Sequence, residues 1–264
     1  DILNGDVNKL PSLSELSYSE AINNLDGKIF IFASDNETDK YSIGMYGKYA
    51  TVRNQGGIYL GLISNDQYIS DSYLNINTKG VRSDISKNLN YIGLYGERTN
   101  IINTGIITDR AENPGITGTA AENNNSVNAI GIYGVMAKVD NTSSVNYAGS
   151  ISNSGNITLG EGGKGIAGFG GSSAQLMNVV NTGNISIKSS ADNQGIGIIL
   201  DKAVLVNNGI PGTPIEIKLG GENAIGIFGD EGSNIALSYT NIGEETNSNA
   251  SSSIGINIKD SALT

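Results

Sequence analysis

Apolar and polar residues alternate over short stretches of this chain, and the same stretches return at a regular interval. The clearest phrase reads Ile-Gly-apolar-aromatic-Gly, and its full copies begin at Ile43, Ile92, Ile130 and Ile225. Weaker copies begin at Ile166, Ile196 and Ile254. Nowhere in the repeat do apolar residues follow the spacing of an amphipathic helix. The interval of 49 residues between the first two copies, falling to 29 between the last two, is typical of stacked repeats.

Two further elements complete each repeat. An Asn-x-Gly corner separates successive phrases at Asn54, Asn103, Asn153, Asn181 and Asn207, with a weaker version at Asn241. A short alternating strand follows several corners, at residues 157–159, 185–187 and 215–219, and at 74–76 in an early repeat. Three strands per repeat predict a coil with three sides, and one such unit cannot bury its apolar residues alone. We therefore expect an all-β chain, a three-sided parallel β-helix that forms a fragment of a longer rod.

The repeats also predict how the chain is divided. Residues 1–40 lack the phrases, so we expect a less regular N-terminal lead-in or cap there. Residues 41–264 are expected to form one array with loop insertions, because a solenoid has no internal domain boundary. The chain begins with Asp1, shows no signal peptide and contains no apolar run long enough to cross a bilayer. We expect it to be a piece of a larger protein, and to be monomeric.

The composition narrows the classes of function. The chain holds 36 Gly and 34 Asn, and only 16% of its residues are charged. It has no Cys, so neither a disulfide framework nor a thiolate metal site is available, and it has no His, the commonest general base and metal ligand. A formal net charge of -10 argues against nucleic acid as a partner, because phosphate binding needs clustered Lys and Arg. We expect no cofactor and no metal.

The amino-acid sequences of the repeats resemble those of one known family. The stretches are NSGNITL at 153–159, NTGNISI at 181–187, NAIGIYG at 128–134 and NAIGIFG at 223–229. They are similar to the passenger repeats of the giant autotransporter adhesins of fusobacteria, over roughly residues 41–258. The resemblance implies a right-handed β-helix at the cell surface of a Gram-negative bacterium, exported by type V secretion. It also implies anchoring in the outer membrane through a C-terminal barrel that this sequence lacks, and attachment to a protein or glycan on other bacteria or host cells.

The asparagine column of the Asn-x-Gly corners is expected to be structural. Side-chain amides of successive coils can hydrogen-bond to one another as an internal ladder, and Asn tolerates the left-handed backbone that a corner needs. The competing interpretation is a series of glycan acceptors, because Asn156-Ile157-Thr158 and Asn184-Ile185-Ser186 match the acceptor triplet. Such triplets arise by chance in a chain this rich in Asn and Ser.

The aromatic position of the first phrase allows two interpretations. If the strand alternates regularly, both apolar residues face inward, and the glycines face outward with the rings of Tyr46, Tyr95, Tyr133, Phe169 and Phe228. Such a stripe of rings beside a glycine-floored groove would suit sugar rings or an extended peptide, with Tyr95 and Tyr133 as candidate ligand-binding residues. Alternatively, the chain bends at the second glycine and turns the rings into a corner of the core, where they form an aromatic stack.

The insertions are the first choice for a recognition site, ahead of the aromatic column, because loops on a rigid rod differ from one coil to the next. The densest polar cluster holds the candidate ligand-binding residues Asp109, Arg110, Glu112 and Glu122. An acidic loop of this kind is expected to attract cationic ligands or basic proteins. The alternative is a solvated acidic surface with no partner.

Three functions follow from these observations. The first is an adhesin segment that attaches cells through the loops or faces of the β-helix, and the second is a purely structural stalk of a large surface protein. The third is an enzyme acting on glycans, since β-helices also carry such activities. Glycan hydrolysis usually needs paired carboxylates, and no acidic pair recurs on adjacent strands. We therefore expect no catalytic residues, and the sequence favours attachment.

Overall fold

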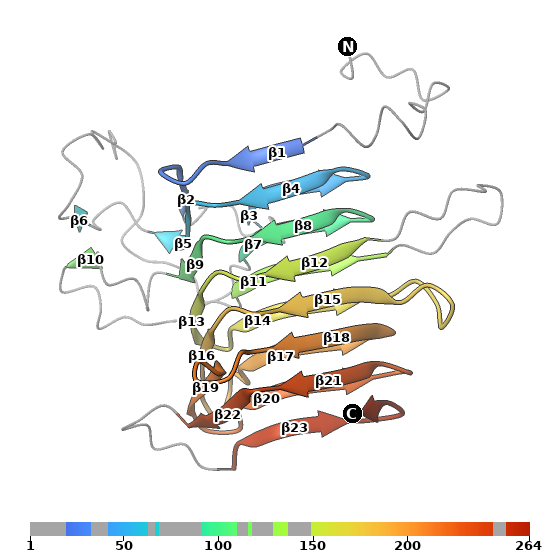
Figure 1. Cartoon of the computed structure of the whole chain (residues 1–264). Coiled ribbons are helices and arrows are strands. Elements are labelled where there is room, and N and C mark those ends of the chain that lie inside the picture. Colours follow the sequence, from blue (N-terminus) through green and yellow to red (C-terminus); the bar gives the residue numbers. More distant parts are fainter. Residues whose placement is uncertain are drawn as a thin grey trace.

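The computed structural model describes residues 20–32, 42–62, 67–68, 91–109, 116–117, 129–136, 149–244 and 252–264. The strand expected at 74–76 lies outside these residues. All regular structure in the described ranges is β, and most of the strands form three parallel sheets (Figure 1). The predicted all-β, three-sided parallel β-helix is therefore confirmed.

Each coil contributes one strand to each of the three sheets. Sheet A contains β1 (Glu20–Asn23), β4 (Thr51–Asn54), β8 (Asn100–Asn103), β12 (Ser150–Asn153), β15 (Met177–Asn181), β18 (Ala203–Asn208), β21 (Asn234–Ser238) and β24 (Ala262–Leu263). Sheet B contains β2 (Lys28–Phe32), β5 (Gly57–Leu62), β9 (Ile106–Asp109), β13 (Ile157–Glu161), β16 (Ile185–Ser189), β19 (Ile215–Gly221) and β22 (Thr240–Glu244). Sheet C contains β3 (Ser42–Lys48), β7 (Tyr91–Glu97), β11 (Ala129–Val135), β14 (Lys164–Phe169), β17 (Ile196–Asp201), β20 (Ile225–Asp230) and β23 (Ile254–Ile258). Two short strands, β6 (Gln67–Tyr68) and β10 (Ile116–Thr117), pair separately and antiparallel.

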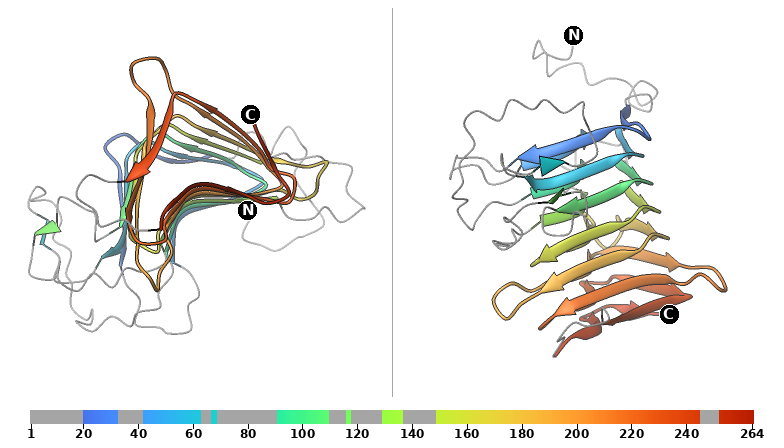
Figure 2. Two further views of the ribbon diagram at one scale, coloured as in Figure 1. Left: turned by 90° about the horizontal axis from the view of Figure 1, so that it is seen from below. Right: turned by 90° about the vertical axis from the view of Figure 1, so that its left-hand side faces the viewer.

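The coil has three sides and a right-handed sense. The view along the axis in Figure 2 shows sheets A, B and C as successive sides, with strands of the same sheet stacked over one another. Seen from the N-terminal end, the chain passes through A, B and C clockwise as it moves away, which makes the helix right-handed (Figures 1 and 2). Sheet C is bent, so this side of the coil is concave on the outside.

The array begins earlier than the sequence pattern indicated. Strands β1 and β2 lie within residues 1–40, which we assigned to a less regular lead-in. They pair in parallel with β4 and β5, with Asn23 opposite Asn54 and Ile29 opposite Ile58. Residues 20–32 therefore belong to the first described coil. The pattern missed them because this coil lacks the Asn-x-Gly spacing, Asn23 being followed by Gly only at Gly27.

The core consists of thin apolar columns to which all three sheets contribute. In the central strands, at least one inward residue is buried to 1% exposure or less and packs on its counterparts in the coils above and below, and sheet B adds a second column with Leu60, Leu159 and Ile187. Sheet A supplies Val52, Ile101, Ile151, Val179, Leu205 and Ile235; sheet B supplies Ile58, Ile107, Ile157, Ile185 and Ile217; sheet C supplies Leu94, Ile132, Ile166, Ile198 and Ile227. Each coil can bury these residues only against its neighbours, which explains why the units must stack.

Sheet C departs from the regular alternation that we considered. The first glycine of the phrase faces inward: a Cβ added to Gly93 or Gly131 would meet the core residue Ile107 or Ile157 of sheet B. The isoleucine before it lies outside the core cluster, 39% exposed at Ile43 although buried at Ile92 and Ile225. Regular alternation is therefore wrong for the first Ile and Gly of the phrase. The chain bends at this glycine, since the next apolar residue again faces the core.

The pairing also corrects the alignment of one repeat. Ile132 pairs with Ile166 and Tyr133 with Ala167, so Gly165 occupies the first glycine position and Ala167 the aromatic position. The copy that we placed at Ile166 is therefore shifted by two residues. Lys164 stands where other coils have isoleucine, and the sequence phrase was missed for that reason.

Left-handed backbone recurs at a different corner from the one expected, with one instance between sheets A and B at Tyr239. No ladder asparagine has a positive φ, whereas residues between sheet C and sheet A do, with φ between 44° and 53° at Tyr49, Arg98, Lys202, Glu231 and Asp260. At the Asn-x-Gly corners, the side-chain amide of the asparagine instead holds the turn by donating to the carbonyl of the glycine two residues later, as from Asn181 to Gly183. The ladder asparagines are the last or penultimate residues of their strands, with extended backbone.

Candidate binding surfaces

The asparagine ladder runs inside the corner between sheets A and B. Each Nδ2 donates to the Oδ1 of the asparagine in the next coil, at 2.6 to 2.7 Å, along the series Asn23, Asn54, Asn103, Asn153, Asn181 and Asn207. The second amide hydrogen reaches a glycine carbonyl, as from Asn181 to Gly183 at 3.0 Å. The last donor, Asn207, meets the Thr240 hydroxyl at 2.8 Å. The predicted ladder is confirmed, and Asn23 extends it, whereas Asn241 lies outside it.

The ladder is closed to ligands. Its members from Asn54 to Asn207 are at most 1% exposed. The triplet asparagines Asn156 and Asn184 are exposed residues that lie outside this column. The ladder therefore fixes the geometry of the rod, and any recognition must use other side chains.

The aromatic residues form a stack on the outer side of sheet C. The rings of Tyr46, Tyr95 and Tyr133 lie nearly parallel, with centroids 5.4 and 5.3 Å apart, and Phe169 adds a tilted ring at 5.2 Å. Tyr46 is 51% exposed. The rings therefore form the aromatic stack that the second interpretation expected, but they lie on the outer side of sheet C and not in a corner of the core. Phe169 reaches the stack from a position two residues along its strand, and Phe228 pairs with Ile199, away from the stack.

The stack offers ring edges rather than open ring faces. The two central rings, Tyr95 and Tyr133, are each covered on both faces by neighbouring rings, whereas the end rings Tyr46 and Phe169 each have one ring neighbour in the described stack. Burial raises the pKa of Tyr95, with a smaller contribution from the nearby Glu97 carboxylate. Glu97 pairs with Lys48 at 3.0 Å beside the stack, and this hydrogen bond raises the pKa of Lys48. Along most of its length the column can contact a ligand only from the side.

The acidic loop cluster is only partly within the described residues. Arg110, Glu112 and Glu122 lie outside them. Asp109 is the last residue of β9 rather than a loop residue, and it is 7% exposed. Its Oδ2 accepts a hydrogen bond from the Gly160 backbone N–H of the next coil at 2.7 Å. The Asp109 carboxylate thus connects two strands of sheet B.

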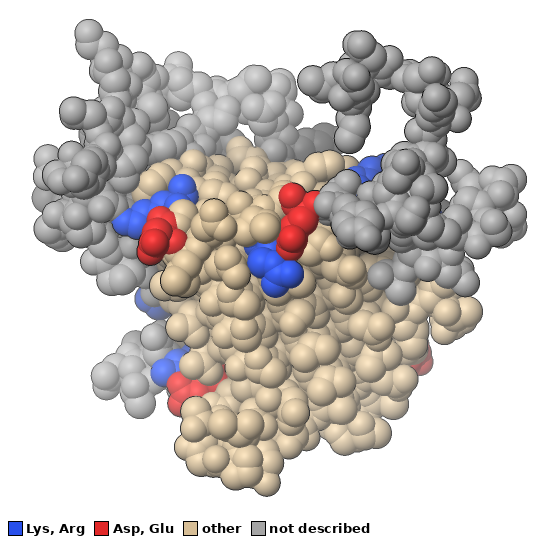
Figure 3. Space-filling view, turned by 45° about the horizontal axis from the view of Figure 1, so that its top comes forward, with Lys and Arg blue, Asp and Glu red and all other residues tan. Residues whose placement is uncertain are grey.

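The outer side of sheet A forms a surface that the motif analysis did not single out. We call it the sheet A face. One of its two columns contains Glu20, Thr51, Asn100, Ser150, Asn178, Val204 and Asn234, and the other contains Ile22, Arg53, Ile102, Ser152, Val180, Val206 and Ala236. Only Glu20 and Arg53 in these columns are charged. Figure 3 shows a broad area of this side with few charged residues.

Hydroxyl, amide and apolar groups alternate on the sheet A face. Asn100, Ser152 and Asn178 are exposed, and so are the apolar side chains of Val180 and Val206, at 40% and 37%. These small side chains stand on paired strands that rigidly fix their spacing along the axis. The face can therefore offer hydrogen-bonding groups and apolar contacts at fixed intervals, with little side-chain entropy to lose on binding.

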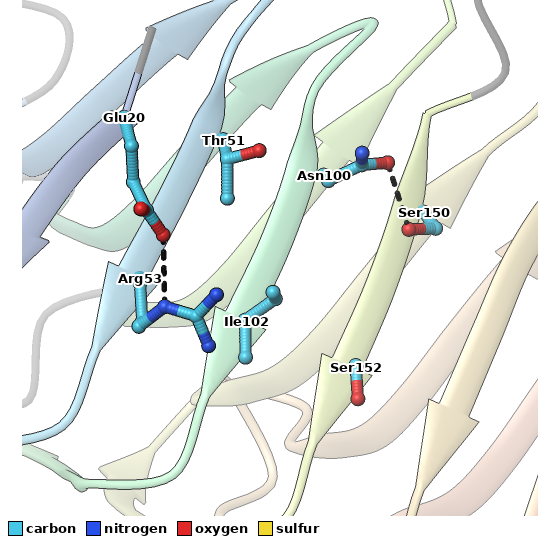
Figure 4. A pocket seen from close by; sticks show the side chains of 7 residues that line it. All are labelled: Glu20, Thr51, Arg53, Asn100, Ile102, Ser150 and Ser152. Carbon is cyan, nitrogen blue, oxygen red and sulfur yellow. Dashed lines mark hydrogen bonds and ion pairs between the residues drawn. The ribbon is translucent and has the colours of Figure 1, made fainter. Parts of the chain in front are cut away.

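A groove of about 540 Å³ crosses the N-terminal half of this face, lined by Glu20, Thr51, Arg53, Asn100, Ile102, Ser150 and Ser152 (Figure 4). Arg53 donates through Nε to Glu20 Oε1 at 2.8 Å, and Ser150 donates to Asn100 Oδ1 at 3.0 Å. The groove residues come from four neighbouring coils. Sequence reasoning missed them because single Thr, Ser and Asn residues form no motif. The available signal was the residues one and three positions before each ladder asparagine, which are rarely charged.

The described residues also bear on two other kinds of site. No three His, Cys, Asp or Glu side chains there come together as a metal site would require. The described part of the chain also has no helix of the length and hydropathy that a bilayer-crossing helix would need. Comparison with known proteins adds no relative: no family model, no curated protein and no solved structure matches this chain.

Proposed function

We propose that this chain is a segment of a cell-surface adhesin that binds glycans on other bacteria or host cells through its sheet A face. The observation that carries the proposal is the broad, nearly uncharged face with its groove, in a chain whose formal charge is -10. Hydroxyl and amide side chains match the hydroxyl groups of sugars as donors and acceptors. The exposed valines and Ile102 can contact the apolar C–H faces of the same sugars.

The ladders support the display role of such a rod. Parallel strands, the buried asparagines and the thin apolar columns fix one coil on the next, so the side chains of the face keep their relative positions. A preformed surface loses less conformational entropy on binding than a flexible one. The resemblance of the repeats to autotransporter passengers supports placement at the cell surface, anchored in the outer membrane of a Gram-negative bacterium.

The aromatic stack is a second candidate surface for the same function. Its phenol groups lie one coil apart along the rod, and Tyr46 is half exposed. Edge contacts of this kind suit hydrogen bonding to sugar hydroxyls better than ring stacking. We rank this surface below the sheet A face because the rings cover one another.

Binding of the isolated chain to intact cells and to a panel of immobilised glycans tests the proposal. Val206→Glu and, in a separate variant, Asn178→Glu place a charge on the sheet A face and should lower binding at least about tenfold, since an unpaired charge must then be desolvated. Ser186→Glu is the matched control, because Ser186 lies on the outer side of sheet B. Tyr95→Ala tests the aromatic stack separately.

Each outcome identifies a different function. No binding by the wild-type chain would contradict the adhesin and favour a structural stalk. Normal binding by the two face variants would exclude the sheet A face, and loss with Tyr95→Ala would move the site to the aromatic stack. Shortened glycans recovered from the assay would point to an enzyme instead.

A further inference from the structure

Arg53 is the one cation in the two columns of the sheet A face, and it lies at the groove. It stands between Ile22 and Ile102 in its column, with Thr51, Asn100 and Ser152 nearby on the same strands or the next ones. Its side chain is 33% exposed. A guanidinium in this position is unusual for a surface whose two columns are otherwise uncharged apart from Glu20, and it offers a specific chemistry to a ligand in the groove.

Glu20 holds the Arg53 guanidinium through its Nε atom. Nε donates to Glu20 Oε1 at 2.8 Å, and among the described residues this is the side-chain hydrogen bond that Arg53 makes. Figure 4 shows the two terminal nitrogens directed away from Glu20, toward Ile102 and the part of the groove that Ser152 lines. Glu20 therefore fixes the plane of the guanidinium and leaves its terminal edge directed into the groove.

We propose that this groove binds the carboxylate of an acidic sugar residue, a uronic or sialic acid unit of a surface glycan; the inference rests on the proposed glycan binding of the sheet A face. The terminal edge of a guanidinium presents two parallel N–H groups that match the two oxygens of a carboxylate. The side chains of Thr51, Asn100, Ser150 and Ser152 then supply partners for the sugar hydroxyls, and Ile102 supplies an apolar contact.

Charge balance favours a carboxylate over a phosphate. Glu20 already offsets the positive charge of Arg53, so the groove is close to neutral before a ligand enters. A singly charged carboxylate leaves one negative charge there, whereas a phosphate monoester would leave nearly two. The net charge of -10 on the chain opposes both, so affinity must come from the paired hydrogen bonds rather than from long-range attraction.

The test compares ligands that differ only in the carboxylate. The probes are 3′-sialyllactose and tri-galacturonic acid, each with its methyl ester, titrated into the wild-type chain by calorimetry at physiological salt. We expect at least one acid to bind about tenfold or more tightly than its ester, the difference that a charge-assisted hydrogen-bond pair gives. Arg53→Ala and Arg53→Lys should abolish this preference, because Lys lacks the paired N–H edge.

Two controls separate recognition from misfolding. Glu20→Gln removes the competing negative charge and keeps an oxygen acceptor for Nε, so acid binding should be retained or stronger. Lys218→Ala removes an exposed cation of sheet B and should change nothing. All variants should keep the wild-type melting temperature within a few degrees, and the side-chain Nε resonance of Arg53 should shift on addition of acid.

The outcomes distinguish this inference from the proposed function. If acids and esters bind equally, or if Arg53→Ala leaves the preference intact, the carboxylate site is wrong while glycan binding stands. If no acid and no neutral glycan binds, both proposals fail together. A preference lost with Arg53→Ala and kept with Glu20→Gln supports the site as described.

Discussion

Within the ladder, both amide hydrogens and the oxygen of an asparagine side chain take part in hydrogen bonds. Asn181 donates one amide hydrogen to Asn207 and the other to the Gly183 carbonyl, while its oxygen accepts from Asn153. Aspartate lacks the donors, and serine is too short and has one hydrogen only. The same residue must therefore recur at this corner, which explains why the column is so regular in the sequence.

Replacing one ladder residue should destabilise the fold through its neighbours. Asn181→Ala leaves Asn153 without its acceptor and Asn207 without its donor inside the corner, at a cost of about 1 to 3 kcal/mol. Asn178→Ala lies on the same strand but on the outer side, and should change the free energy of unfolding by less than about 0.5 kcal/mol. Urea denaturation of both variants checks this, and equal midpoints would contradict a stabilising ladder.

Tyr91 is a buried residue with an unusual hydroxyl. It is 1% exposed, and its oxygen has no hydrogen-bond partner among the described residues. Tyr91→Phe removes this unpaired group and should raise the free energy of unfolding at pH 7, by about 1 kcal/mol or more. A lower stability of the variant would show that the hydroxyl has a partner.

Tyr91 should also make the stability of the fold depend on pH in the alkaline range. Burial raises the pKa of Tyr91 to about 12 from its ordinary value of 10.0. The folded state therefore favours the neutral phenol. The resulting contribution to the free energy of unfolding is complete below pH 10 and is lost as pH rises from 10 to 12. The wild-type chain should lose stability relative to Tyr91→Phe across this window, by up to about 1.4 kcal/mol per pH unit. Parallel stability curves for the two chains would contradict the shift.

At the residue scale, the sequence predicted what recurs and missed what occurs once. The ladder positions followed from asparagines placed two residues before a glycine in five coils. Tyr91 lies just before the phrase, at a position that holds Ala129 and Ala224 in other coils, so no column pointed to it. Arg53 was unnoticed for the same reason, since its column holds Ile102 and Ser152 in the next coils.

At the element scale, the glycine column determines the shape of sheet C. An added Cβ at Gly131 would lie 2.6 Å from the Gly165 carbonyl oxygen and 2.8 Å from Ile157 Cγ2. Neither atom can move easily, because one is backbone and the other belongs to the core. The strand can therefore bend inward here only with glycine, and the concave side of the coil depends on it.

Gly131→Ala should consequently destabilise the fold by about 1 to 3 kcal/mol, as overpacking of a dense interior does. Gly243→Ala is the control on sheet B, because a Cβ there meets nothing within 4 Å. The control should be neutral or slightly stabilising, since alanine restricts the unfolded chain. Thermal unfolding of the two variants measures the difference, and similar losses would show that packing at Gly131 is not the cause.

The strands themselves were predictable, whereas their faces were less so. Alternation and period place most strands, because each coil repeats the same order of corner and apolar stretch. The bend in sheet C reversed the orientation of Ile43 and Gly44, which local alternation cannot reveal. The sheet A face was invisible for another reason: Thr51, Asn100 and Ser150 become neighbours only through the register of three coils.

At the scale of the whole molecule, stability is a sum over neighbouring coils. Every strand inside the three sheets pairs with one strand above and one below, the six end strands pair with one, and strands of distant coils in these sheets do not pair. Strand β23 pairs with β20 alone in the sheet order, and its side chains are mostly exposed or half-buried. Strands such as β14 and β17 are paired on both sides and hold fully buried residues.

Amide hydrogens should exchange faster in the end strands than in strands that are paired on both sides. Protection in β23 and β24 should be at least about tenfold lower than in β14 and β17, because end coils of a repeat array open without disturbing the rest. Exchange followed by mass spectrometry of peptides resolves these strands. Uniform protection from β1 to β24 would indicate instead that the coils unfold as one unit.

The asparagine ladder also gives the rod a polarity. Every Nδ2 points toward the C-terminal side and every Oδ1 toward the N-terminal side, so the amide dipoles add from Asn23 to Asn207 as peptide dipoles add in a helix. Reversing one amide would set two donors against each other and two oxygens against each other, so the series can reverse only as a whole. The ladder therefore determines which group a neighbouring coil must present at each end. A coil that joins beside Asn23 must supply a hydrogen-bond donor, and the coil after Asn207 must supply an acceptor, as the Thr240 hydroxyl does.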